Sequence, residues 1–146
     1  MKLGALLQPD VPASLADWTY AGLRVLTGAF LVYGTWDNIT SQERMLEFVQ
    51  FMSAFGFPRP DLLAPFSVWV QFICGGLLVL GLLTRWAGLL VCINFVVAVV
   101  MVHWSEDFRG WWPAIILVFL GAHFFVVGSG RFGLDRLAWR RESHGE

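Results

Sequence analysis

The chain has 146 residues, of which 57% are hydrophobic and 14% are charged, and its mean hydropathy is +0.63. Soluble domains carry about a quarter charged residues, so this composition excludes an ordinary soluble domain and favours a membrane protein. The net charge of −1 excludes an overall basic surface for nucleic acid.

Long apolar runs that are almost free of charge are the signature of transmembrane helices. The chain contains four of them, at residues 15–36, 62–83, 86–104 and 112–127. We therefore predict an all-α fold, an integral membrane four-helix bundle that forms a single transmembrane domain over residues 1–146. The lipid bilayer is the first partner that this prediction implies.

An additional amphipathic helix is predicted at residues 40–55, between the first two spans. The stretch Thr40-Ser-Gln-Glu43 has the spacing of a capping box, in which Thr and Glu bond free backbone donors at a helix start. Apolar residues then recur at helical spacing, at Met45, Phe48, Val49, Met52 and Phe55. This pattern favours a helix at the membrane surface, or equally a helix packed on its own bundle.

The distribution of Lys and Arg predicts the orientation of the chain. The last segment, residues 129–146, reads as a basic cytoplasmic tail with Arg131, Arg136, Arg140 and Arg141. With both termini inside, Lys2 and Arg85 add to these four, against Arg44, Arg59 and Arg109 outside. Because cytoplasmic loops carry the excess of basic residues, we expect a multi-pass protein of the bacterial inner membrane with both termini cytoplasmic.

Polar residues in the predicted spans fall into two layers, because each helical residue rises about 1.5 Å. An outer cluster comprises Asp37, Asn38, His103 and Glu106. Imidazole and carboxylates together can hold a metal ion or relay a proton. The alternative is that Asp37 and Asn38 only mark the end of the first helix.

A deeper layer contains Arg24, Gln71, Asn94 and His123. A charged residue inside the bilayer is costly, so it normally faces the bundle and has a partner. We therefore select Arg24, Gln71, His103 and His123 as candidate ligand-binding residues. Arg24 reaching to the headgroups and His123 serving as an ordinary bundle contact are the alternatives.

Several segments carry a resemblance to a known family. Leu23-Arg24 is followed by Gly28, Phe30 and Gly34, and the surface helix ends in "FGFPRP". The most specific segment is "GGLLVLGLLTR", residues 75–85, and "GSGRFGLD", residues 128–135, closes the match. With these motifs the chain resembles the DoxX family of small four-helix bacterial membrane proteins. It departs from many relatives at Trp36-Asp37-Asn38, where they carry Lys, and at Gln71, where they carry Glu.

The resemblance implies a membrane component of a redox or oxidative-stress system, since some relatives resemble quinone-linked subunits of sulfur-compound oxidation. A quinone as ligand and a membrane or peripheral redox protein as partner follow as expectations. A homo-oligomer is a separate expectation, because four short helices make a narrow bundle and a transport path through it would need more than one copy. Two alternatives stay open: a non-catalytic scaffold or anchor for a partner protein, and a small transport or metal-handling protein built on the outer cluster. No nucleotide, nucleophile-elbow or zinc-protease motif is present in the sequence.

Overall fold

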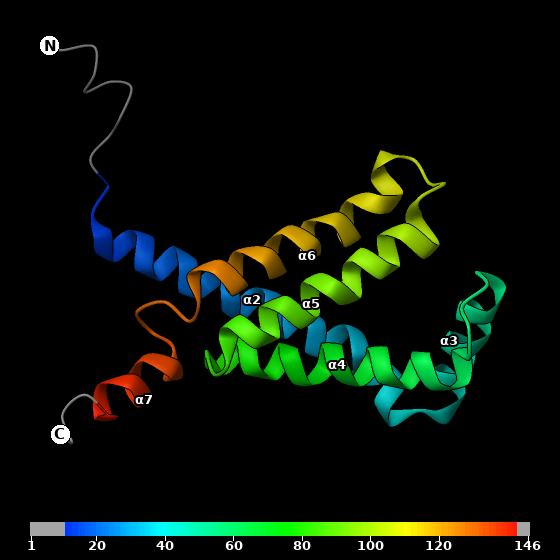
Figure 1. Cartoon of the computed structure of the whole chain (residues 1–146), viewed down its shortest axis with the longest axis horizontal. Helices are drawn as coiled ribbons and strands as arrows, with labels where there is room; N and C mark the ends of the chain where they lie inside the picture. Colours follow the sequence, from blue (N-terminus) through cyan, green and yellow to red (C-terminus); the bar gives the residue numbers. More distant parts are fainter. Residues whose placement is uncertain (1–10, 143–146) are drawn as a thin grey trace, which may run out of the picture.

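The computed structural model describes residues 11–142, and this part of the chain is helical without any strand. Figure 1 shows the elements in chain order. They are α2 (Ala13–Thr40), α3 (Gln42–Ala54), α4 (Pro60–Leu80), α5 (Thr84–Ala98), the π-helical turn η1 (Val99–His103), α6 (Phe108–Val127) and α7 (Leu134–Glu142). The predicted all-α class is confirmed. Lys2 and residues 143–146 of the predicted tail lie outside the described residues.

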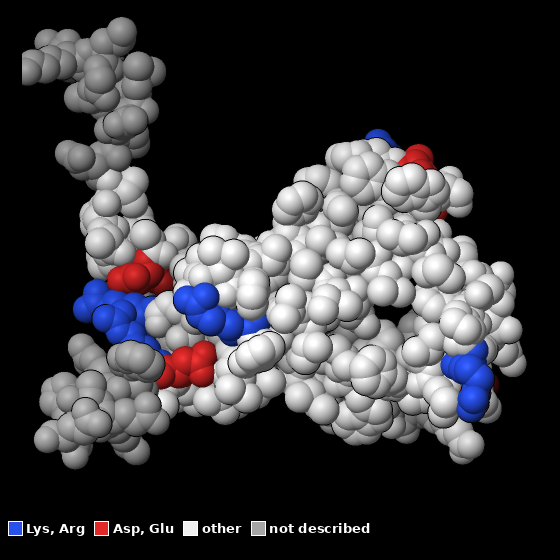
Figure 2. Space-filling model, in the orientation of Figure 1, with Lys and Arg blue, Asp and Glu red and all other residues white. Residues whose placement is uncertain are grey.

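Three helical segments are long and apolar enough to cross a membrane: Pro60–Leu80, Thr84–His103 and Phe108–Val127. Large apolar side chains cover their outer surfaces, where a soluble protein would carry polar ones. Figure 2 shows charged residues gathered toward the two ends of the molecule, with a broad uncharged surface between them. The structure thus supports a multi-pass membrane protein.

α2 is the longest helix, with 28 residues, or about 42 Å at the usual rise. That length exceeds the roughly 30 Å of bilayer hydrocarbon. However, α2 carries Asp17, Arg24 and Asp37, and it is not among the three segments apolar enough to qualify by composition. A fourth span therefore stays a prediction.

The core lies where the four long helices meet. α2 packs on α4 and α5 packs on α6, with a smaller contact joining α4 to α5. Each main contact is a close approach of two glycines, Gly28 with Gly75 and Gly88 with Gly121. A Cβ on Gly28 would lie 2.5 Å from the Gly75 carbonyl oxygen, and one on Gly88 would lie 2.7 Å from that of Gly121. Small residues allow such backbone contact in membrane bundles.

The observed bounds of α3, α5 and α6 differ from the predicted ones. α2 runs on through Thr40, whose hydroxyl bonds back to the Trp36 carbonyl, so the N-cap of α3 is Ser41 and not Thr40. The predicted capping box is wrong, because the residue three positions after Ser41 is Arg44 and the Ser41 N–H bonds to the Asp37 carbonyl instead. α6 begins at Phe108 because the Asp107 side chain accepts from the Gly110 N–H. The third predicted span ends in the π-helical turn and is not α-helical throughout.

Candidate functional site

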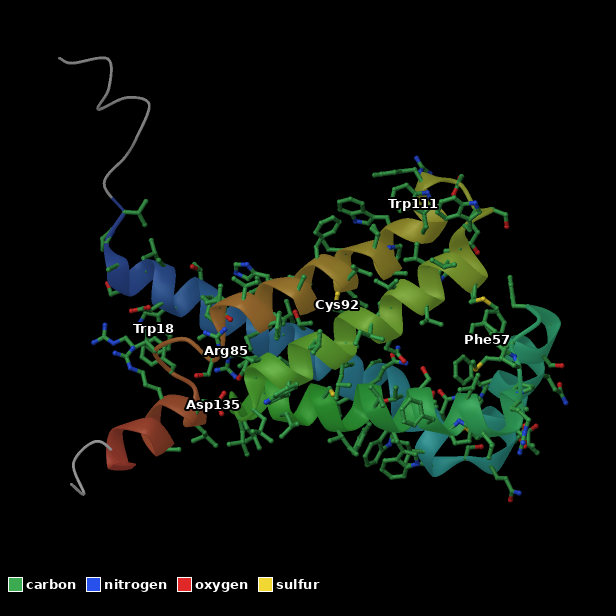
Figure 3. The ribbon with its side chains drawn as sticks, in the orientation of Figure 1. Trp18, Phe57, Arg85, Cys92, Trp111 and Asp135 are labelled. Carbon is green, nitrogen blue, oxygen red and sulfur yellow. The ribbon has the colours of Figure 1, made fainter. Side chains whose placement is uncertain are left out.

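An apolar cavity lies between α3, α4 and the α5–η1 segment. Its volume is about 450 Å³. The visible face is hollowed beside α3 in Figure 2, and Figure 3 places Phe57 at this end of the molecule. The wall is mainly apolar and rich in phenylalanine, with Phe48, Phe51, Phe57, Phe66 and Phe95 among its residues. Such a partly open apolar space suits a ligand with a ring or chain.

A short polar chain lines the cavity in the middle of the bundle. The Gln71 Nε2 donates to the Ser67 hydroxyl across 3.2 Å, and that hydroxyl donates to the Asn94 Oδ1 across 2.9 Å. Gln71 and Ser67 lie one turn apart on α4, whereas Asn94 comes from α5. This chain leaves the Asn94 amide N–H groups and one Gln71 N–H group without a partner among the described residues.

His103 closes the cavity at the far end of η1. Its Nδ1 lies 2.6 Å from the Glu106 Oε2, and its side chain is 27% exposed. A carboxylate on Nδ1 fixes the ring orientation and leaves Nε2 as the nitrogen open to a ligand. The π-helical turn widens the helix at this point, and such turns are common at functional sites.

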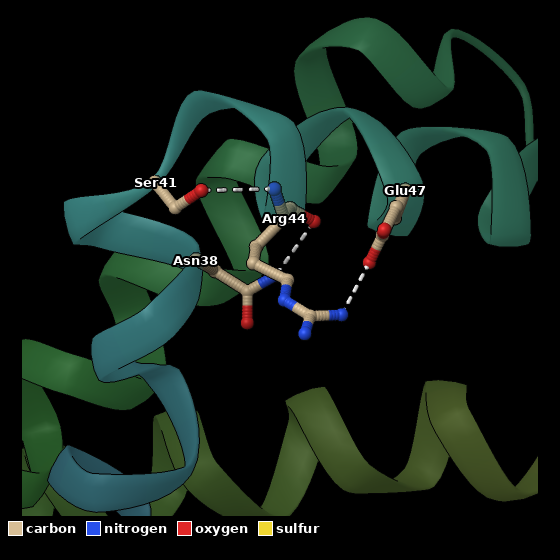
Figure 4. A network of polar contacts seen from close by, with 4 residues as sticks. All are labelled: Asn38, Ser41, Arg44 and Glu47. Atoms are coloured by element: carbon tan, nitrogen blue, oxygen red, sulfur yellow. Dashed lines mark hydrogen bonds and ion pairs between the residues drawn. The ribbon is translucent and has the colours of Figure 1, made fainter.

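α3 forms one side of the cavity and turns its apolar face toward its own bundle, with Phe48, Phe51 and the buried Met52 lining the space. Figure 4 shows how α3 is attached to α2: Ser41 caps its first turn, and the Asn38 amide donates to the Arg44 carbonyl across 3.2 Å. Arg44 also pairs with Glu47 at 2.8 Å, and this hydrogen bond raises the pKa of Arg44.

Arg24 lies outside this cavity. Its guanidinium is buried and donates from Nη1 to the carbonyls of Leu78 and, at 3.2 Å, Val79. Both carbonyls belong to the last turn of α4, where the helix runs out of its own donors. That of Leu78 also accepts from the C-cap Gly81 N–H across 3.2 Å. Arg24 therefore acts as a cap for α4, and its positive charge complements the negative end of the helix dipole.

Two further contacts of the same kind tie the helix ends together. Arg85 donates to the carbonyls of Phe125 and Val126 at the end of α6, at 3.0 and 2.8 Å. The Asp135 carboxylate accepts from the backbone N–H groups of Leu83 and Thr84, at 2.6 and 3.0 Å, where α5 begins. Figure 3 shows Arg85 and Asp135 near each other at the end opposite Phe57.

The other candidate residues are separated from the cavity. His123 is exposed on α6, with its ring edge-on to Tyr20 at 5.6 Å between centroids. Asp37 is exposed on α2, and the described residues contain no group of three or more His, Cys, Asp or Glu side chains that could hold a metal ion. Within the outer cluster, His103 contacts Glu106, while Asn38 bonds to α3.

Sequence reasoning passed over Ser67 as a site residue and used Asn94 only as a depth marker. Ser67 precedes Gln71 by one helical turn, so a search for polar residues at i and i+4 inside an apolar run finds it. Its partnership with Asn94 depends on how α4 and α5 align, and no local pattern encodes that alignment.

The fold and the cavity can be compared with known proteins. A family model described as DoxX matches residues 20–104, which is more than half of the chain. The chain belongs to the DoxX family. Every residue that lines the cavity between α3, α4 and the α5–η1 segment lies within the DoxX match, whereas α6 and α7 lie beyond it. Comparisons with curated proteins and with solved structures return no match.

Proposed function

We propose that this DoxX-family protein binds a quinone-class ligand in the cavity between α3, α4 and α5, as a small component of a redox or oxidative-stress-linked membrane system. The observation that carries the proposal is a phenylalanine-lined space crossed by the Gln71–Ser67–Asn94 chain. A quinone has the matching parts, a flat apolar ring and carbonyl oxygens that accept hydrogen bonds.

The size and wall of the cavity support this class of ligand. A volume of about 450 Å³ lies within the range of roughly 300–1,000 Å³ that is typical of small-molecule sites. Phenylalanine rings gain from offset or edge-to-face contacts with a second ring. A quinone also partitions into the bilayer, from which it can reach a cavity bounded by helices with apolar outer surfaces.

The amides supply specificity for a carbonyl. The free N–H groups of Asn94 and Gln71 can donate to a quinone oxygen, and a plain hydrocarbon would leave them unpaired. A site built to hydrogen-bond its ligand rejects an analogue that lacks the bonding group much better than an apolar pocket rejects a small change in size.

His103 and Glu106 give the site a group that exchanges protons. Reduction of a quinone carbonyl takes up protons, and an imidazole oriented by a carboxylate is suited to deliver them. The electrons would come from a membrane or peripheral redox protein. The proposed location is the bacterial inner membrane with both termini cytoplasmic, because the six basic residues assigned to that side exceed the three on the other.

The test is a binding titration on the purified full-length protein in mild detergent, with a short-chain quinone as quencher of tryptophan fluorescence. Asn94→Leu should weaken binding about 5- to 10-fold, since one lost hydrogen bond costs about 1–1.5 kcal/mol. His103→Gln should also weaken it. His123→Gln is the matched control, because His123 lies on α6 away from the cavity.

Equal affinity in all three variants would refute the assignment of the cavity. A protein that binds no quinone but purifies with a stable protein partner would instead favour the scaffold function.

A further inference from the structure

A second cavity, of about 480 Å³, lies at the opposite end of the bundle from the first. It is bounded by the start of α5, the loop after α6 and the start of α7. Its charged side chains are Arg85, Asp135 and Arg136, and Trp86 stands at its edge with 66% of its surface exposed. The three candidate spans all begin or end here, which is where the lipid headgroups are expected.

The cavity has an excess of positive charge that is free to act on a ligand. Arg85 uses Nη1 for the α6 carbonyls, which leaves Nε and Nη2 without a partner in the described part of the chain. The Arg136 side chain has no ion-pair partner among the side chains of residues 11–138 either. The Asp135 carboxylate, in contrast, is committed to the N–H groups of Leu83 and Thr84.

The loop after α6 adds backbone donors to the basic side chains of this cavity. Gly128 has φ +84° and ψ −154°, a conformation that essentially only glycine adopts. A Cβ at this position would lie 3.3 Å from the Arg85 Nε, so the glycine lets the arginine lie against the loop. Ser129 and Gly130 follow in the cavity wall, and their N–H groups donate no hydrogen bond among the described residues.

We propose that this cavity binds the phosphate group of an anionic phospholipid headgroup, through Arg85, Arg136 and the N–H groups of the loop. Guanidinium groups bind phosphate oxygens well, and basic pockets between membrane helices hold anionic headgroups. The site would fix the protein to one leaflet, the one that faces the basic end. It is independent of the quinone site, which lies between α3, α4 and α5.

The test is native mass spectrometry of the full-length protein in mild detergent with equal amounts of phosphatidylglycerol and phosphatidylcholine. The wild-type protein should retain phosphatidylglycerol in preference. Arg136→Gln should lower that preference about fivefold, since one cation near the membrane surface contributes about 1 kcal/mol. Arg131→Gln is the matched control: Arg131 lies at the same end but pairs with Asp17 at 3.3 Å and does not line the cavity.

Retention of both lipids in equal amounts by the wild-type protein would overturn the proposal, and so would an equal loss in the two variants, which indicates general charge attraction. Glycerol 3-phosphate distinguishes the two sources of a phosphate group. If it displaces phosphatidylglycerol at equal concentration, the site is one for a soluble phosphate and the lipid assignment is wrong.

Discussion

The close approach of α2 and α4 predicts opposite effects for the same substitution at two glycines of one helix. In Gly28→Ala the new Cβ would lie 2.5 Å from the Gly75 carbonyl oxygen and 2.9 Å from the Val79 nitrogen. Both atoms belong to the backbone of α4, so neither can rotate away and the helices must separate. At Gly34, on the same helix, a Cβ would meet nothing within 4 Å.

The magnitudes follow from these surroundings. Overpacking of this kind costs about 1–3 kcal/mol. Replacing an unhindered helical glycine by alanine instead gains about 0.5–1 kcal/mol. For a chain of this length, 1 kcal/mol corresponds to roughly 2–4 °C in Tm. We therefore expect Gly28→Ala to lower the Tm by about 5 °C and Gly34→Ala to raise it by about 2 °C.

The assay is thermal unfolding of both variants and the wild-type protein in one detergent, followed by tryptophan fluorescence. Because α4 carries Ser67 and Gln71, Gly28→Ala should also weaken the binding of a quinone, whereas Gly34→Ala should leave it unchanged. A Gly28→Ala protein as stable as Gly34→Ala would mean that α2 and α4 do not cross at these glycines, and the packing described above would be refuted.

Three further predictions concern the helix ends and the core. Asp135→Ala should lower the free energy of unfolding by about 1–2 kcal/mol, because it removes the cap of α5. Denaturant titration measures this change, with Asp61→Ala as the control at an exposed carboxylate. Arg24→Leu should destabilise the protein by about 2–5 kcal/mol, because two carbonyls at the end of α4 lose a charged donor. An Arg24→Leu protein whose Tm equals that of the wild type would contradict the capping role. A maleimide in mild detergent should modify the half-buried Cys92 before the buried Cys74, and equal rates would show that Cys74 is not in the core.

The helices themselves were predictable because apolar runs and helical spacing are local properties of the sequence. The spacing of Phe48, Met52 and their neighbours gave the amphipathic helix, but it could not decide between the membrane surface and the bundle. That choice depends on the turn at Ser41, where Asn38 bonds to the first turn of α3 and directs its apolar face over the cavity.

The roles of the polar residues depend on contacts between distant segments. Depth along α2 correctly marks Arg24 as a residue that needs a partner, but its acceptors, Leu78 and Val79, lie more than fifty positions away in sequence. A single polar residue in an apolar run looks the same whether it caps a helix, as Arg24 does, or lines a cavity, as Gln71 does. Only the packing of α2 on α4 separates the two cases.

The most direct test of the quinone site is photolabelling with an azido-quinone, followed by peptide mapping of the full-length protein. The proposal predicts adducts on α3, on the 63–71 part of α4 and on the 90–103 segment, and unlabelled quinone should prevent them. Adducts confined to α6 or α7, or labelling that unlabelled quinone does not reduce, would contradict the assignment of this cavity.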